Sequence, residues 1–192
     1  KNKFNFEEEV LDLIWFSTGG GKTEAYLLVA AYEIFRRRLE WKKMGFGTSI
    51  FTRYTYRFLT ADQFIRTARL ICSMEKIRTK NKELLGSERI SLGLYVGEGL
   101  TPNWIKSNQE NRGAKEVYQQ IITNNNPTTD GTKFQITECP NCGTALLPHK
   151  KPESGYTEID QGYGFEVNEQ EMKIRCPNKI CHFYKDEDGL PL

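Results

Sequence analysis

The stretch Ser17-Thr18-Gly19-Gly20-Gly21-Lys22-Thr23 is the strongest indication of fold class in this sequence. A short apolar run, residues 10–16, precedes it, and apolar side chains recur at steps of three and four over residues 22–39. The apolar run predicts a buried strand, and the spacing predicts a helix of about five turns. A glycine-rich loop between a strand and a helix can turn its backbone N–H groups toward a phosphate, aided by the positive end of the helix dipole.

The loop therefore predicts a site for ATP and Mg²⁺. Lys22 would reach the outer phosphates and the Thr23 hydroxyl would bind Mg²⁺, which makes these two residues the predicted catalytic ones. The alternative is a glycine-rich turn with an incidental lysine. Phe16 stands where the strict phosphate-loop pattern has glycine, which favours the helicase version of the loop over the versions of small GTPases and nucleotide kinases. The predicted nucleotide site as a whole comprises Thr18, Gly19, Gly20, Gly21, Lys22, Thr23 and Glu24.

Strand and helix patterns alternate after the loop. Residues 48–54 and 90–96 predict two further strands, and residues 60–79 and 107–122 predict two further helices. Such alternation predicts an α/β fold, with a parallel sheet covered by helices. Cys72 lies on the apolar face of the helix predicted at 60–79, so we expect a core thiol there.

The composition of the sequence changes near residue 133, after which cysteine, glycine and proline are frequent and helical periodicity is weak. Two cysteine pairs lie in this part. Two residues separate Cys139 from Cys142, four separate Cys176 from Cys181, and thirty-three lie between the pairs. Each cysteine pair, with the residues between its two cysteines, is expected to form a short turn that we call a knuckle. Two knuckles brought together form a tetrahedral thiolate site, which suits Zn²⁺. The pairs therefore predict a zinc ribbon over residues 134–184, with short strands at 156–159 and 165–167 and a structural metal.

Two alternatives to four thiolate ligands stay open. His182 or His149 could replace one thiolate, although four cysteines already fill a tetrahedral shell. A disulfide could form instead, but a nucleotide-binding protein is expected in the reducing cytoplasm, where disulfides are rare.

Composition excludes several classes of protein. The 192 residues have a net charge of +2 and are 38% apolar, which argues against disorder. No apolar run approaches the roughly 20 residues of a membrane span, so no membrane contact is expected. Residues 36–80 carry twelve Lys and Arg against three acids, which predicts either a polyanion-binding surface or solvated helix faces.

The sequence also lacks an expected feature of a phosphate-loop hydrolase, an acidic residue at the end of a later buried strand that would hold Mg²⁺. Asp186-Glu187-Asp188 reads as a solvated turn. The chain begins with Lys1, and we expect it to be a piece of a longer protein whose catalytic acids follow Leu192, so that the piece alone would be inactive.

Three stretches together carry a family resemblance: Trp15–Leu28, Arg53-Tyr-Thr-Tyr-Arg57 with Gln63, and Leu94–Trp104. Together with the cysteine pairs they resemble the superfamily-two helicases of DISARM anti-phage defence systems. The resemblance implies ATP-driven work on nucleic acid. It also implies a partial RecA-like P-loop lobe over residues 1–133, a zinc-ribbon insertion over 134–184 and a return to the lobe over 185–192.

The same resemblance implies contacts with the phosphates and bases of DNA, either single-stranded or with a single-stranded overhang, and a partner protein of the defence complex. The residues expected to contact nucleic acid are Arg53, Tyr54, Thr55, Arg57, Gly97, Thr101, Pro102 and Trp104.

Two other classes of function stay open. One is a P-loop ATPase that remodels a protein partner through the zinc ribbon, and the other is a zinc-ribbon nucleic-acid binder with an inert loop.

Overall fold

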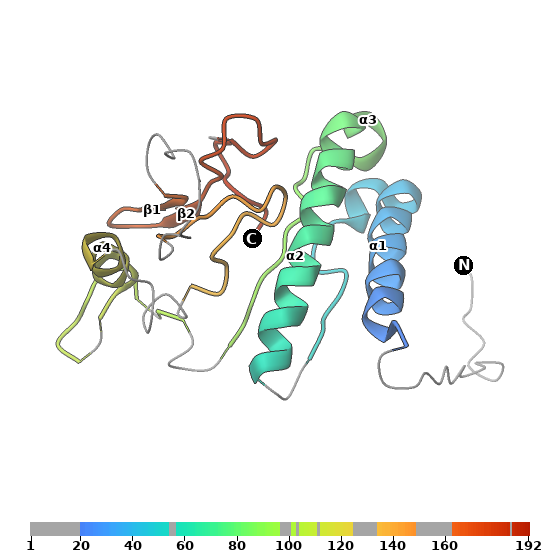
Figure 1. Cartoon of the computed structure of the whole chain (residues 1–192). Coiled ribbons are helices and arrows are strands. Elements are labelled where there is room, and N and C mark those ends of the chain that lie inside the picture. Colours follow the sequence, from blue (N-terminus) through green and yellow to red (C-terminus); the bar gives the residue numbers. More distant parts are fainter. Residues whose placement is uncertain are drawn as a thin grey trace.

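The computed structural model describes residues 20–53, 57–96, 101–102, 104–110, 112–124, 134–148, 163–184 and 186–192, without the side chains of 57–61. Helices dominate the first part of the chain and short strands the last part (Figure 1). The helices are α1 (Lys22–Trp41), the 3₁₀ helix η2 (Lys42–Gly45), α2 (Arg57–Lys80), α3 (Lys82–Leu85) and α4 (Ala114–Asn124). The strands are β1 (Phe165–Val167) and β2 (Met172–Ile174).

Helix α1 confirms the helix predicted after the glycine-rich loop. It begins after Gly21, whose φ of 78° lies in the left-handed region that glycine adopts without steric cost, and the Ala25 N–H donates to the Gly21 carbonyl oxygen. The apolar side chains that recur along this helix are only partly covered. Phe35 packs against the core, but Leu28 and Tyr32 are 72% and 66% exposed. Helical spacing located the helix correctly, but it does not show which side of the helix is covered.

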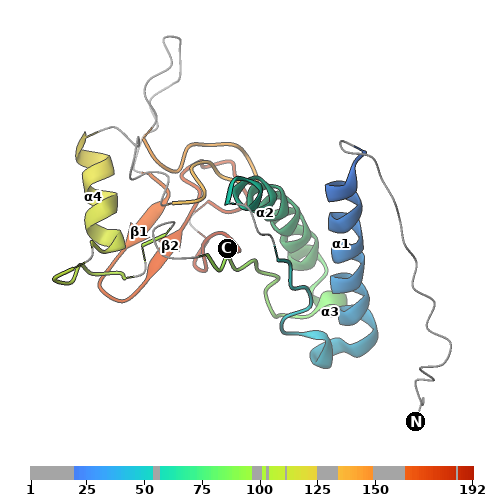
Figure 2. The ribbon, with the colours of Figure 1, turned by 90° about the horizontal axis from the view of Figure 1, so that it is seen from below.

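Helix α2 confirms the second predicted helix and is the central element of the structure. It lies between α1 on one side and the cysteine-rich part of the chain on the other in both views (Figures 1 and 2). Ala68 and Cys72 are fully buried in the core shared with the cysteine-rich part. Ile71 and Met74 pack in a second cluster with Ile90 and with side chains of α1. The helix is therefore buried along two faces.

Three buried charged residues hold the segment after α3 against helices α1 and α2. The Arg38 guanidinium donates to the carbonyl oxygens of Leu85 and Glu88 at 2.9 and 2.6 Å. Arg78 binds the Glu75 carboxylate with two hydrogen bonds of 2.7 and 2.6 Å, and that carboxylate also accepts the Ile90 N–H. Buried charges are stable only when they are paired in this way.

The expected strands at 48–54 and 90–96 do not form in the described residues. No strand is assigned at 48–53 or 90–96. A strand requires a ladder of hydrogen bonds to a neighbour, whereas the Leu92 N–H donates to the Pro191 carbonyl oxygen and the neighbouring Tyr95 is fully exposed. The strand predicted at 10–16 lies outside the described residues. A RecA-like parallel sheet is thus not seen in the described part of the chain.

The sheet that does form is an antiparallel pair in the cysteine-rich part. Phe165 pairs with Ile174 and Val167 with Met172. Strand β1 confirms the strand predicted at 165–167, β2 was not predicted, and the strand predicted at 156–159 lies outside the described residues.

Helix α4 begins at Ala114, seven residues later than predicted. Residues before it form a turn instead, in which Gly113 donates to the Ser107 hydroxyl and the Ala114 N–H donates to the Trp104 carbonyl oxygen. A side chain at Gly113 would meet the Lys106 backbone at 2.3 Å, so the turn requires glycine there.

One hydrophobic core joins α2 and α4 to the cysteine-rich part. Val117 and Ile121 of α4 are buried with Phe134, Phe165 and residues on both sides of the cysteine pairs. Phe134 and Phe165 pack edge to face, with ring centroids 4.9 Å apart. The domain boundaries expected at 133 and 184 stay predictions, and this core contains residues from both sides of the first.

Candidate metal centre and nucleotide loop

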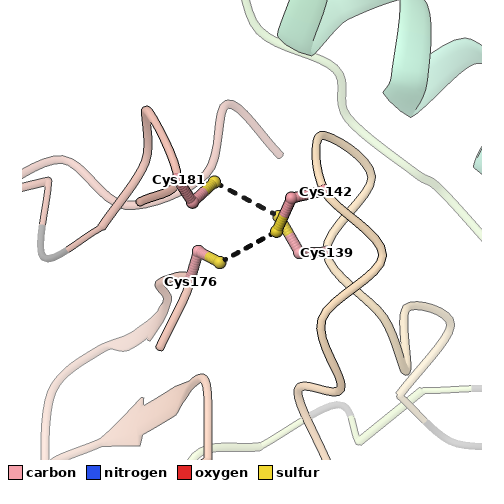
Figure 3. Close-up of side chains that lie close together, drawn as sticks. All are labelled: Cys139, Cys142, Cys176 and Cys181. Carbon is pink, nitrogen blue, oxygen red and sulfur yellow. Dashed lines mark hydrogen bonds between the residues drawn. The ribbon is translucent and has the colours of Figure 1, made fainter. Parts of the chain in front are cut away.

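The four predicted metal ligands come together at one place. Cys139 and Cys142 approach from the segment before β1, and Cys176 and Cys181 from the segment after β2 (Figure 3). The four sulfur atoms all lie within 4.8 Å of one another. All but Cys142 are buried.

The spacing of the sulfur atoms fits a tetrahedral metal site. The Cys139 and Cys181 Sγ atoms are 3.9 Å apart, and those of Cys142 and Cys176 are 3.5 Å apart. A tetrahedron with metal–sulfur bonds of about 2.3 Å has edges of about 3.8 Å. A disulfide would need about 2.05 Å between the sulfur atoms, and all four thiols are free. The geometry therefore favours metal coordination over the disulfide alternative.

Backbone hydrogen bonds shape each knuckle. In the first, the Gly143 N–H donates to the Cys139 carbonyl oxygen, and Gly143 has a φ of 76°, in the left-handed region that glycine adopts without steric cost. In the second, the Cys181 N–H donates to the Asn178 carbonyl oxygen and the Cys176 N–H to the Phe183 carbonyl oxygen. Each cysteine thus sits on a turn that is closed by its own segment.

The surroundings change the proton affinity of the buried thiols. A hydrogen bond from the Cys176 thiol and N–H groups of the first knuckle lower the pKa of Cys139 to about 5. The same hydrogen bond, with burial, raises the pKa of Cys176 above its ordinary value. Cys139 therefore gives up its proton more readily than Cys176, and a divalent cation would favour the deprotonated form of all four cysteines.

Of the two histidines considered as ligands, His182 does not join the cluster. His182 is exposed and packs its ring against Phe183, with centroids 4.9 Å apart. His149 lies outside the described residues. Cys72 is the buried core thiol that the sequence predicted, and burial raises its pKa to about 12. Within the described residues, the group that could hold a metal consists of the four paired cysteines.

Sequence reasoning missed the polar side chains that surround the thiols. The Asn141 amide donates to the Cys181 sulfur at 3.2 Å, and Lys76 of α2 donates to the Asn141 oxygen at 3.3 Å. The Asn178 amide donates to the Thr144 hydroxyl oxygen at 3.1 Å. A signal was present, because Cys-Pro-Asn occurs at the start of both knuckles.

The predicted nucleotide loop is described from Gly20 onward, so Thr18 and Gly19 lie outside the described residues. Gly20 and Gly21 are exposed just before α1, and Lys22 and Thr23 open the helix in half-buried positions. Lys22 and Thr23 thus lie at a helix N-terminus, and the binding of ATP and Mg²⁺ there stays a prediction.

Helix α2 contacts the end of this loop through two side chains that were not predicted as site residues. The Gln63 amide donates to the Thr23 hydroxyl oxygen at 3.1 Å. Arg66 forms an ion pair with Glu24, with 2.7 Å between nitrogen and oxygen, and a second ion pair with Asp62. Gln63 belongs to the stretch that carried the family resemblance, but sequence alone did not indicate its partner.

The predicted nucleic-acid residues are spread over several segments. Arg53 is exposed in the extended segment before α2, and Arg57 is the first residue of α2. Thr101 and Pro102 are half-buried, and Trp104 is 55% exposed just before the turn that leads to α4. Tyr54, Thr55 and Gly97 lie outside the described residues. Nucleic-acid contact by this set stays a prediction.

The acidic segment near the C-terminus forms the turn that the sequence predicted. The Asp188 N–H donates to the Asp186 carboxylate at 3.0 Å and the Gly189 N–H to its carbonyl oxygen at 2.9 Å. Arg89 lies 3.8 Å from each of the two aspartate carboxylates. Among the described helices, none is long and apolar enough to cross a membrane.

The described residues thus define a protein with a cluster of four cysteines that could hold a metal ion. The cluster is packed on helix α2, whose other end contacts the glycine-rich loop. The chain is 34% identical to the DISARM protein DrmA of Bacillus paralicheniformis, in an alignment of 191 positions that covers 93% of the chain. It spans 15% of the length of that protein. No family model and no solved structure matches the chain. This similarity confirms the resemblance to a DISARM protein that the motifs suggested, and the helicase assignment stays a prediction.

Proposed function

We propose that this chain is the ATP-binding part of an ATP-dependent DNA helicase or translocase that acts in bacterial anti-phage defence. The observation that carries the proposal is the start of α1, where Gly21, Lys22 and Thr23 follow the phosphate-loop pattern at a helix N-terminus. Similarity to DrmA over 93% of the chain supports the role in defence.

In this proposal the loop holds ATP and Mg²⁺. Backbone N–H groups of Gly20 and Gly21 surround the phosphates, the Lys22 ammonium neutralises the outer ones, and the Thr23 hydroxyl binds Mg²⁺. Gln63 holds the Thr23 hydroxyl oxygen from α2. The exposed side chains of Arg53 and Trp104 supply sequence-independent contacts to DNA phosphates and bases.

The four-cysteine centre holds one Zn²⁺ as a structural ion. Four thiolates fill a tetrahedral shell, and a catalytic zinc would need an open position. Its ligands come from two segments 33 residues apart in the sequence, so the ion ties the segment before β1 to the segment after β2. The metal thereby holds the two segments of the small ribbon together.

ATPase assays on the full-length protein test this proposal, with and without single-stranded DNA. We expect DNA to stimulate turnover in the wild type and Lys22→Ala to abolish turnover, because the lysine charge on the phosphates is lost. Lys43→Ala is a matched control, since Lys43 is an exposed lysine of η2. Unchanged turnover in Lys22→Ala would refute the nucleotide site, and stimulation by a protein partner instead of DNA would favour the protein-remodelling alternative.

A further inference from the structure

The metal centre is surrounded by two hydrogen-bond chains, and each one crosses from one knuckle to the other. The first runs from the Lys76 ammonium to the Asn141 oxygen at 3.3 Å, and from the Asn141 amide nitrogen to the Cys181 sulfur at 3.2 Å. Asn141 belongs to the first knuckle and Cys181 to the second. This chain therefore links helix α2 to both knuckles.

The second chain runs in the opposite direction. The Asn178 amide nitrogen donates to the Thr144 hydroxyl oxygen at 3.1 Å, and that oxygen lies 3.2 Å from the Cys142 sulfur. The same amide nitrogen is 3.9 Å from the Cys142 sulfur itself. Asn178 belongs to the second knuckle and Cys142 to the first. The asparagine of each knuckle is therefore directed toward the second cysteine of the other knuckle.

The orientation of both amides is fixed by their other contacts. An ammonium group can only donate, so the oxygen of Asn141 must face Lys76 and its NH₂ group must face Cys181. The oxygen of Asn178 accepts the Ile180 N–H at 3.1 Å, which leaves its NH₂ group for Thr144. Both amides therefore present donors toward sulfur.

Donors directed at sulfur are what a four-thiolate site needs. Four thiolates around one divalent cation leave a net charge of −2, and hydrogen bonds from amides and hydroxyls stabilise that charge. A thiolate has no proton to donate, so with metal bound the Thr144 hydroxyl donates to Cys142 while it accepts from Asn178. The positive charge of Lys76 acts on the same site through Asn141.

We propose that Asn141, Asn178 and Lys76 are positioning residues of the metal centre, which hold the second cysteine of each knuckle in place and offset the negative charge of the four thiolates. The proposal rests on the metal site proposed above and extends it to residues beyond the ligands. It also makes α2 a partner of the metal centre, because Lys76 lies on that helix.

Zinc affinity, measured on the full chain by competition with a chromophoric chelator, tests this proposal. Removal of groups that orient metal ligands typically weakens binding about 10- to 100-fold. We expect losses of this size for Asn141→Ala, Asn178→Ala and Lys76→Met. Lys179→Met is the matched control, because Lys179 is an exposed lysine of the second knuckle. Its affinity should stay within about threefold of the wild type, since an exposed charge contributes little.

A double variant separates a hydrogen-bond chain from general charge effects. Lys76 and Asn141 act in series on Cys181, so their effects should not multiply, and Lys76→Met/Asn141→Ala should bind zinc about as weakly as Asn141→Ala alone. Lys76→Arg, which keeps the charge and the donor, should restore most of the affinity. The Lys76 variants keep the test available if an asparagine variant fails to fold, because Lys76 is only half-buried.

The outcomes distinguish this inference from the metal site itself. Wild-type affinity in Asn141→Ala and Lys76→Met, or fully multiplicative losses in the double variant, would overturn the inference while leaving the metal site intact. A wild-type chain that binds no zinc would instead refute the metal site on which the inference rests.

Discussion

The ion pair between Glu75 and Arg78 gives the sharpest prediction about stability. Their side chains are only 4% and 6% exposed. Arg78 makes two hydrogen bonds to the Glu75 carboxylate and two more to the carbonyl oxygens of Gly86 and Ser87, at 2.9 and 3.0 Å. The change Arg78→Met removes all four and leaves a buried carboxylate, with the Ile90 N–H still donating to it.

Breaking a buried pair by removing one partner costs about 3–5 kcal/mol, a large part of the roughly 5–15 kcal/mol that stabilises a typical protein. We expect a loss of this size in the free energy of unfolding, measured by urea denaturation of the 192-residue chain with its metal bound. Adding Glu75→Gln to Arg78→Met should recover part of the loss, because it removes the uncompensated charge.

A matched control is present in the same protein. Glu33 and Arg36 of α1 have the same three-residue spacing, but their side chains are 29% and 30% exposed. Arg36→Met should cost about 1 kcal/mol or less, because solvent screens an accessible pair. If Arg78→Met costs no more than Arg36→Met, the reasoning that burial makes the inner pair important is wrong.

Three further predictions concern other parts of the molecule. Gln63→Leu in the full-length protein should weaken MgATP binding about fivefold, the effect of one hydrogen bond, because Thr23 loses its partner on α2. Equal MgATP affinities of the variant and the wild type, measured by calorimetry, would contradict this. Arg53→Ala should weaken single-strand binding alike for all DNA sequences and flatten its salt dependence by about one charge, whereas an unchanged slope in binding titrations would make Arg53 an ordinary surface residue. Because its pKa is raised to about 12, Cys72 should react with iodoacetamide at pH 8 about 1,000-fold more slowly than an ordinary thiol. The reaction should become faster only as the pH rises toward 12. Rapid labelling of Cys72 in the native metal-loaded protein, followed by mass spectrometry, would show that helix α2 is not packed as described.

Sequence was a reliable guide where the signal was local. Helical spacing located α1 and α2, whose backbone hydrogen bonds lie within the element. It failed for the strands expected at 48–54 and 90–96, since a strand depends on a partner elsewhere in the chain and a local pattern cannot supply one. The exposed side chains of Leu28 and Tyr32 show the same limit, because the spacing marks an apolar face without showing what covers it.

The metal centre also combines features that a local pattern predicts with contacts that it does not. Four cysteines in two short-spaced pairs were enough to predict which residues meet. The repeated Cys-Pro-Asn pattern was visible in the sequence, but the crossing of Asn141 and Asn178 between the knuckles depends on how the two segments face each other. The contribution of Lys76 could not have been predicted, because it comes from a helix 65 positions away in the sequence from Asn141.

Metal content measured on the purified protein tests the central claim most directly. Elemental analysis of the chain should find one zinc ion per molecule, and Cys139→Ser should lose it, because three thiolates cannot complete the tetrahedral shell. Native mass spectrometry should give the mass of the zinc complex with all five cysteines reduced. A metal-free native protein, or a disulfide between Cys139 and Cys142, would contradict the account.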